Sequence, residues 1–467
     1  MEVVMKSLMT MTALFCCMVL SAGLAYGAST VQISKDTSGG APDGNSRNPG
    51  VSADGRYVVF QSSATDLVSD DTNGFDDIFV YDTGADTMTR VSLGYDGGGS
   101  GDPQLTGGSD YPAISGDGKY VTFSTHADDV INYSNYQQIF VHNMEGTYNN
   151  QVLVSKNTSN GEANNNSYQS VLSYNGKYIA FESDATDLTA LPGPVDGGGN
   201  RDIFVREMES GTTYLVSRNT SGEYANGFSS NPSISNDGTL IAFQSSAYDL
   251  VAGDVDDGFS DVFVLDGPHN TMELISKAYG GGTSDGYSSY PHISGNGRYV
   301  AFQSVATNLV ENDTNGGFDI FLHDRETGVT EIVSVDQDGN QVTDHGTNGY
   351  AGGISADGRY VTFSTPSASL VDADTNGVAD IFLRDMKEKK TVRVSIGNGG
   401  EEPDQYVYAQ YMDVTDNGLT AVFSTWATNL GGIPTDSKQN VFMRKDAYDP
   451  SFPWTMFLPA TTKMTNK

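Results

Sequence analysis

Ser52-Ala-Asp-Gly-Arg-Tyr-Val-Val-Phe60 is the stretch of sequence that decides the fold. Its Asp-Gly pair predicts a tight turn because glycine accepts positive φ, and the apolar run that follows predicts a strand buried on both faces. The motif recurs with small changes along the chain, and its glycines are Gly55, Gly118, Gly176, Gly238, Gly297, Gly358 and Gly418. Seven copies spaced by 58 to 63 residues predict one supersecondary unit repeated seven times.

Each copy contains the sequence of four short strands. The first strand ends at the serine of the motif, and the second runs through the motif's aromatic end. After a long polar loop the third strand reads Asp77-Ile-Phe-Val-Tyr81, and the fourth reads Thr89-Arg-Val-Ser92. Four antiparallel strands per unit are the plan of a propeller blade. We therefore predict an all-β, seven-bladed β-propeller with four-stranded antiparallel blades, over residues 28–446.

The two ends of the repeat region predict how the ring closes. Thr30-Val-Gln-Ile-Ser34 has the sequence of a fourth strand with no preceding three. The seventh copy has candidate strands at Tyr411–Val414, Thr420–Ser424 and Asn440–Arg444, but no fourth. We predict that the N-terminal strand completes the seventh blade, so that no open seam remains between the first blade and the last.

The Ser-x-Asp-Gly-x-Tyr-Val-x-Phe and Asp-Ile-Phe motifs resemble the TolB-type, WD40-like propeller repeats of exported bacterial proteins. The resemblance covers residues 30 to about 446 and implies the propeller fold. TolB itself has an α/β domain before its propeller, and this chain leaves no room for one. The chain is therefore not expected to be TolB, and the resemblance implies no particular function.

The N-terminal sequence predicts export. One lysine in Met1–Lys6 is followed by the apolar run Ser7–Leu20 and the small-x-small pattern Ala25-Tyr-Gly27, as in a signal peptide of residues 1–27. Both cysteines, Cys16 and Cys17, fall inside it, so the mature chain is expected to have no thiol. We expect a periplasmic or extracellular protein that does not span a membrane, with a short tail at 447–467.

The charge of the chain limits its partners. Fifty-nine acidic residues against 25 basic ones give a net charge of −34. Such a field repels nucleic-acid phosphates and anionic membrane surfaces, so neither is expected as a partner. Bound cations and cationic partners are favoured instead.

A short acidic pattern recurs in the loops between the second and third strands. Three loops read Asp-x-Asn-Gly followed by a further Asp, with the residues Asp71, Asn73 and Asp77, then Asp313, Asn315 and Asp319, then Asp374, Asn376 and Asp380. Oxygen ligands on alternate residues around a glycine turn suit Ca²⁺, which is the cofactor we predict here. The alternative is structural, since Asn-Gly is a turn signal and Asp caps turns through its own carboxylate.

Tyrosines stand at the start of several innermost strands. Tyr111, Tyr290 and Tyr411 occupy this place, and they are predicted to surround the channel mouth. There they would contact a peptide or glycan by stacking and hydrogen bonding. The alternative is that they only fill a hydrated rim.

The sequence shows no catalytic motif. It has no Gly-x-Ser-x-Gly elbow, and its six histidines share no spacing typical of a metal site. We therefore expect an exported, non-catalytic binding or scaffold protein with a protein, peptide or glycan ligand at an acidic loop rim. The alternative is a carbohydrate-active hydrolase or lyase that uses rim carboxylates.

Overall fold

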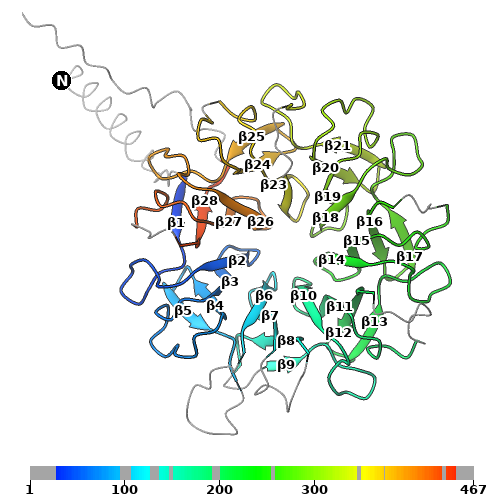
Figure 1. Ribbon diagram of the computed structural model, residues 1–467, viewed down its shortest axis with the longest axis horizontal. Helices are drawn as coiled ribbons and strands as arrows, with labels where there is room; N and C mark the ends of the chain where they lie inside the picture. Colours follow the sequence, from blue (N-terminus) through cyan, green and yellow to red (C-terminus); the bar gives the residue numbers. More distant parts are fainter. Residues whose placement is uncertain are drawn as a thin grey trace, which may run out of the picture.

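Seven four-stranded antiparallel sheets form a ring around a central channel (Figure 1). The computed structural model describes residues 28–94, 107–126, 136–146, 151–191, 200–253, 258–343, 349–372, 374–433 and 438–448, which contain strands and turns but no helix. The predicted seven-bladed all-β propeller is confirmed. The predicted signal peptide at 1–27 and nearly all of the predicted tail lie outside the described residues.

The strands have the same four places in every blade. The innermost strands are β2 (Ser46–Val51), β6 (Ser109–Ile114), β10 (Ser167–Leu172), β14 (Ser229–Ile234), β18 (Ser288–Ile293), β22 (Tyr350–Ile354) and β26 (Val407–Val414). The second strands are β3 (Tyr57–Ser62), β7 (Tyr120–Thr125), β11 (Tyr178–Ser183), β15 (Leu240–Ser245), β19 (Tyr299–Ser304), β23 (Tyr360–Thr365) and β27 (Thr420–Thr425). The third strands are β4 (Asp77–Asp82), β8 (Gln138–Asn143), β12 (Asp202–Glu207), β16 (Asp261–Asp266), β20 (Asp319–Asp324), β24 (Asp380–Asp385) and β28 (Asn440–Lys445). The outermost strands are β5 (Thr87–Arg90), β9 (Gln151–Leu153), β13 (Thr212–Leu215), β17 (Thr271–Leu274), β21 (Val329–Ile332), β25 (Lys390–Arg393) and, in the seventh blade, β1 (Ser29–Gln32).

The N-terminal strand closes the ring, as the sequence predicts. β1 pairs antiparallel with β28, with Val31 opposite Met443 (Figure 1). The pairing continues past the strand, where the Ile33 amide donates to the Val441 carbonyl at 2.8 Å. Ile33 is fully buried among side chains of the first and seventh blades. The chain therefore links its two ends through both hydrogen bonds and core packing.

The core consists of apolar layers between neighbouring blades. In the first blade Phe60 of β3 stacks on Phe79 of β4, with ring centroids 5.9 Å apart, and both rings are fully buried. Val59 and Val80 face the other way and pack against Phe123 of the second blade. Strands two and three are thus apolar on both faces because each lies between two other blades.

The serine motif builds the turn between the first two strands. In the first blade the Ser52 hydroxyl donates to the Asp54 carboxylate at 2.7 Å and accepts the Tyr57 amide at 2.9 Å. Gly55 has φ of +75°, which other residues adopt only with strain. These short turns form one face of the ring, which we call the turn face. The loops between strands two and three and between blades form the other, the loop face.

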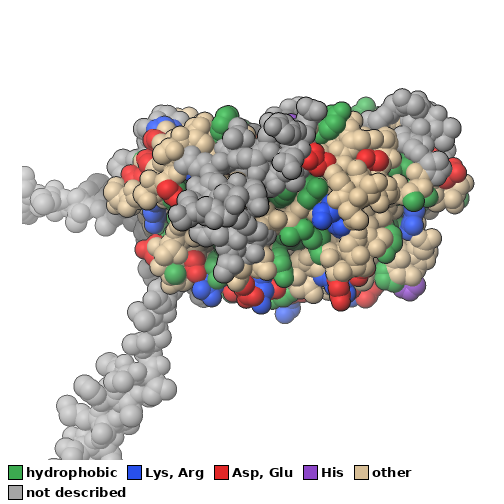
Figure 2. Space-filling model, turned by 90° about the horizontal axis from the view of Figure 1, so that it is seen from below, with side chains coloured by type: hydrophobic (Ala, Val, Ile, Leu, Met, Phe, Trp, Pro, Cys, Tyr) green, Lys and Arg blue, Asp and Glu red, His purple; other side chains and the backbone are tan. Residues whose placement is uncertain are grey.

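Acidic side chains are spread over the surface. Seen edge-on, the ring is a flattened disc with Asp and Glu side chains near both faces (Figure 2). The negative charge is therefore not confined to the loops. Among the described residues, none belongs to a helix long and apolar enough to cross a membrane.

Candidate functional site in the central channel

The channel contains a cavity of about 260 Å³ that all seven innermost strands line. Its lining includes two titratable side chains, His292 and Asp413, and two aromatic side chains that could contact a ligand, Tyr290 and Tyr411. Ligand sites of propellers and barrels lie in such central spaces because strands from all round the ring converge there. The cavity is therefore the candidate functional site.

The turn face closes one end of this channel. The residue after the serine or threonine of each motif lies next to the axis, and hydrogen bonds between backbone groups link each blade to the next in an unbroken ring of seven. The residues concerned are Ala53, Gly116, Asp117, Tyr174, Asn236, Gly295, Asn296, Ala356 and Asp416. In addition, the Asn236 amide of the fourth blade donates to the Asp416 carboxylate of the seventh at 3.3 Å. Because these two blades are not neighbours, this contact crosses the ring, and we infer that ligands enter from the loop face.

Two glycines make this closure possible. A Cβ atom at Gly116 would lie 2.4 Å from the Tyr174 ring, and one at Gly295 would lie 2.5 Å from the Asn236 amide. A larger residue at Gly116 would displace the Tyr174 ring, and one at Gly295 would displace the Asn236 side chain that reaches across the ring. The closed end therefore depends on differences between the seven copies of the repeat.

Asp413 places a carboxyl group in the channel wall. It is on β26, and its oxygens accept the backbone amides of Val51 at 3.0 Å and Val414 at 2.8 Å. Burial raises the pKa of Asp413 to about 6, with a further contribution from the negative charge of Asp416, while the two amides act in the opposite direction. A carboxyl group with this pKa exists in both protonation states near neutral pH and can exchange a proton with a bound molecule.

His292 occupies the equivalent place in the fifth blade. It lies two residues before the motif's Ser294, as Asp413 lies two residues before Thr415. Burial lowers the pKa of His292 to about 4, opposed by a hydrogen bond with the backbone of Ala351. Its imidazole is therefore neutral at neutral pH. The channel thus combines a carboxyl group that titrates with an imidazole that does not.

The three predicted tyrosines lie at or next to this cavity. Tyr290 and Tyr411 line it, and the ring of Tyr111 lies 6.3 Å from that of Tyr411. Tyr111 and Tyr290 have φ of 52° and 51°, where the innermost strands bulge. Their role in ligand binding stays a prediction. The ring of Tyr350, which the sequence did not single out, packs edge-on against Tyr290 at 5.6 Å.

Sequence reasoning missed Asp413 and His292, although a comparison of the copies contains the signal. At the position two residues before the motif's serine or threonine, the seven copies read Gly50, Ala113, Val171, Ser233, His292, Gly353 and Asp413. Titratable side chains occur in only two of them. A search for departures from the repeat, in place of a search for its shared residues, would have identified both.

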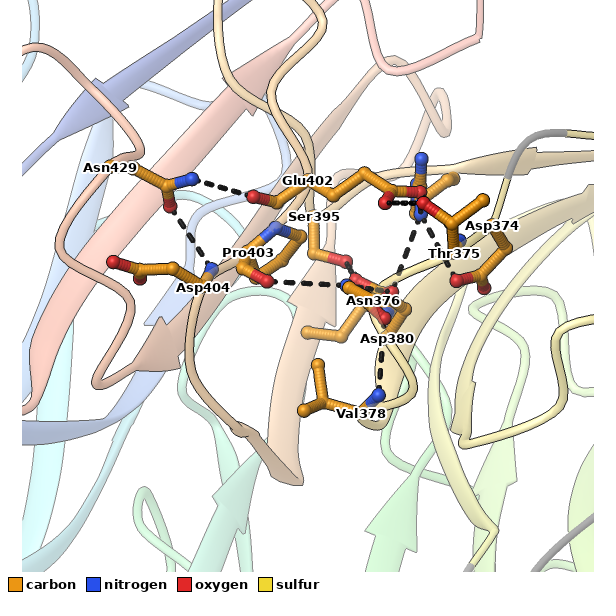
Figure 3. Close-up of polar contacts among 12 residues, drawn as sticks. Asp374, Thr375, Asn376, Val378, Asp380, Ser395, Glu402, Pro403, Asp404 and Asn429 are labelled. Atoms are coloured by element: carbon orange, nitrogen blue, oxygen red, sulfur yellow. Dashed lines mark hydrogen bonds and ion pairs between the residues drawn. The ribbon is translucent and has the colours of Figure 1, made fainter.

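The nine predicted metal ligands form three loops of the same construction. In each loop the asparagine side chain donates its amide to the last aspartate, as Asn376 does to Asp380 at 2.9 Å (Figure 3). Its oxygen accepts a backbone amide two residues later, as in the Val378 contact at 3.1 Å. The structure therefore brings the asparagine and the last aspartate of each loop together, with the asparagine oxygen bonded within its own turn.

Cationic or amide side chains lie against the acids of these loops. In the sixth blade Arg393 donates to Glu402 at 2.7 Å and pairs with Asp374 and Asp380 at 3.4 and 3.5 Å. Figure 3 shows the side chains of Asp374, Asp380 and Glu402 in one part of the loop region. In the first blade Arg90 pairs with Asp71 at 3.5 Å. Burial raises the pKa values of Asp71 and Asp374 to about 6 in spite of these arginines.

The sequence contains a signal for these arginines as well. Arg90 and Arg393 lie two residues before the serine of the fourth strand, where blades two to five carry Leu153, Leu215, Leu274 and Ile332. In the fifth blade the Gln341 side-chain amide, in place of an arginine, donates hydrogen bonds to Asp313 at 2.7 Å and to Asp319 at 2.9 Å. Across the described ranges, no three His, Cys, Asp or Glu side chains are arranged to hold a metal ion.

Replacing Arg393 with leucine is expected to destabilise the fold by about 3–5 kcal/mol, because it leaves buried carboxylates without a cation. Raised pKa values favour the protonated acid in the folded state, so this variant should be more stable at pH 5 and lose stability as pH rises through about 6. Urea unfolding at pH 5 and pH 8 measures both effects. Arg56→Leu removes a half-exposed pair with Asp82 and should cost far less stability, because solvent screens an exposed ion pair. Equal losses in the two variants would contradict this interpretation of Arg393.

Calcium stays a prediction for these loops, and the fifth blade is the most direct place to test it. There an amide group, in place of a guanidinium, lies between Asp313 and Asp319. A site of micromolar affinity should stabilise the fold by roughly 4 kcal/mol at thousandfold excess of Ca²⁺. The measurement is the Tm in EDTA and in millimolar Ca²⁺, for the wild type and for Asp313→Ala. An equal Tm in all conditions would assign the loops to turn formation alone.

Comparison with known proteins identifies the fold. No protein-family model and no curated protein sequence matches the chain. The structure resembles oligogalacturonate lyase from Vibrio parahaemolyticus, with TM-score 0.50, 10% identity, and 90% and 97% of the two chains covered. It also resembles the β-propeller domain of the Trilobed protease from Pyrococcus furiosus, with TM-score 0.50, 11% identity, and 89% and 98% covered.

TolB from Acinetobacter baumannii is a further structural neighbour, with TM-score 0.38 and 11% identity. The similarity covers 76% of this chain and 64% of TolB, so the chain matches less than two thirds of that protein. TolB-type proteins, to which the sequence motifs show a resemblance, are thus among the structural neighbours of this chain.

These neighbours correct the functional expectation. We expected a non-catalytic binding or scaffold protein, mainly because the sequence has no catalytic motif. That expectation is wrong as an inference from the fold, since the solved propellers of similar size and shape include a lyase and a domain of a protease. A propeller can supply catalytic groups from scattered positions in its channel, which no linear motif reveals. The comparisons thus show that the chain has a β-propeller fold.

Proposed function

We propose that this protein is an exported hydrolase that cleaves an uncharged saccharide in the closed-ended central channel. The observation that carries the proposal is Asp413, a carboxyl group in the channel wall whose pKa is raised to about 6. Strongly perturbed carboxyl groups in cavities are typical of catalytic acids. Residues 1–27, with their signal-peptide pattern, support export.

The proposed chemistry uses Asp413 as a general acid. In its protonated form it donates a proton to the leaving oxygen as the glycosidic C–O bond breaks. Water then adds to the sugar carbon, and the proton that this water loses restores the acid. The neutral imidazole of His292, held through a hydrogen bond with the backbone of Ala351, leaves its other ring nitrogen to accept a hydrogen bond from substrate or water.

Charge in and around the channel supports an uncharged substrate. The residues lining the cavity include a carboxyl group and neither lysine nor arginine. The whole chain carries a net charge of −34, so anionic sugars meet a repulsive field. Tyr290 and Tyr411 offer aromatic faces beside the carboxyl group, and sugar rings stack on such faces through their C–H groups.

The size of the cavity supports a single sugar unit as its occupant. Its volume of about 260 Å³ is slightly below the usual range for ligand pockets, roughly 300–1,000 Å³. The natural test is a panel of uncharged nitrophenyl glycosides with the mature chain at pH 5 to 6. Release of nitrophenol from at least one of them is expected, whereas inactivity on the whole panel together with inactivity on neutral oligosaccharides would refute the proposal.

A further inference from the structure

Three exposed aromatic residues occupy one structural position at the loop-face end of the innermost strands. Phe228, Tyr287 and Tyr406 each directly precede an innermost strand, in blades four, five and seven. Their carbonyl oxygens accept equivalent hydroxyl groups from the second strand of the blade, namely Ser245 at 3.2 Å, Ser304 at 2.9 Å and Thr425 at 3.2 Å. Blades one to three carry Asn45, Gly108 and Asn166 at this position. The aromatic side chains are therefore not required by the fold.

These rings remain exposed although neighbouring side chains hold two of them in place. Phe228 is 42% exposed, Tyr287 is 50% exposed and Tyr406 is 41% exposed. Phe259 packs edge-on against Tyr287 with ring centroids 4.8 Å apart. The Arg201 guanidinium lies 5.2 Å from the Phe228 ring. Fixed and exposed aromatic faces lose little conformational freedom when they bind a ligand.

The fixed rings lead toward the candidate active site. Tyr287 and Tyr290 are three residues apart in sequence, so their Cα atoms lie at most about 11 Å from each other. Tyr290 lines the cavity. An extended molecule that stacks on Tyr287 at the loop face can therefore reach past Tyr290 into the channel.

We propose that the loop face binds an extended, uncharged polysaccharide, with sugar units stacked on Tyr287 and Phe228 outside the channel while one unit occupies it. This inference rests on the proposed function and adds that the substrate is a polymer. Three observations support the proposal. The aromatic rings are held in place, Tyr287 is close in sequence to Tyr290 of the cavity, and the net negative charge of the protein disfavours anionic polysaccharides. A protein ligand on the same face is the competing outcome.

The test is native gel electrophoresis through soluble neutral polysaccharides, such as hydroxyethyl cellulose, galactomannan and mixed-linkage glucan. The wild type should be retarded by at least one of them, and Tyr287→Ala should weaken this retardation about tenfold. Tyr214→Ala is the matched control, because Tyr214 is 50% exposed, as Tyr287 is, but lies on the outermost strand β13 at the periphery of the ring. Phe228→Ala provides a second variant in another blade, should Tyr287→Ala fail to fold.

The outcomes separate this inference from the proposed function. Asp413→Asn should retain polysaccharide binding while turnover is lost. Retardation of the wild type that Tyr287→Ala and Phe228→Ala leave unchanged would overturn the inference, as would the absence of retardation by every neutral polysaccharide. Hydrolysis of small glycosides without binding of any polymer would overturn the inference while the proposed function stands.

Discussion

Asp413→Asn is expected to lower kcat on a cleaved saccharide by a factor of about 10² to 10⁴, the usual contribution of a general acid. Asparagine keeps the size of the side chain but has no proton to donate. The wild-type kcat/KM should fall as pH rises above about 6, because Asp413 then loses the proton that the leaving oxygen needs. In the variant this limb of the pH profile should disappear. Initial rates between pH 4 and pH 8 measure both effects.

A matched control separates this effect from general damage. Asp357→Asn changes an exposed aspartate in the motif turn of the sixth blade, where three other blades carry Asn175, Asn296 and Asn417. This variant should retain full activity and the pH profile of the wild type. If Asp413→Asn retained activity within a factor of about three, Asp413 would not be the acid, and the channel would lose its principal argument for catalysis.

Removal of the N-terminal strand is expected to produce the largest loss of stability. A chain starting at Lys35 lacks β1 and the fully buried Ile33, so the outer edge of β28 becomes exposed. Loss of a buried isoleucine costs about 2–5 kcal/mol, and each buried hydrogen bond of Thr30, Gln32 and Ser34 contributes about 1 kcal/mol more. A total above about 5 kcal/mol approaches the whole stability of many domains.

The measurement is the Tm by circular dichroism, compared with a chain starting at Ala28 that keeps the strand. The shortened chain should melt far lower or lack a cooperative transition. Addition of a peptide with the sequence of residues 28–35 should restore part of the transition, because the vacant edge of β28 remains available for pairing. A Tm equal to that of the control would show that the other blades hold the ring closed without β1.

The repeat made the fold predictable because its residues serve purposes that every blade shares. Ser52, Asp54 and Gly55 build a turn, and Phe60 and Phe79 fill the space between blades, so the same types recur in the copies. The site was not predictable in this way. Asp413 and His292 occupy a position where the other blades need only a small or apolar side chain facing the channel, so their types differ from copy to copy.

The acidic loops show a second limit of reasoning from local sequence. Asp374 and Asp380 are close in sequence, whereas their partner Arg393 lies on the next strand, β25. Glu402, which also pairs with Arg393, follows that strand. A pattern within one loop cannot reveal a partner from another element. The carboxylates therefore resembled free ligands in the sequence, although the fold supplies a guanidinium to them.

The contact between Asn236 and Asp416 has a consequence for how small molecules enter and leave the channel. Because the turn face is closed, substrate, water and product all pass through the one opening at the loop face. If the channel hydrolyses a polysaccharide as proposed, the water consumed in each turnover must already be inside when the sugar unit enters. The released unit then leaves only after the rest of the polysaccharide moves aside. Product release should then limit the rate of turnover on long polysaccharides. Short oligosaccharides should turn over faster even though they bind more weakly.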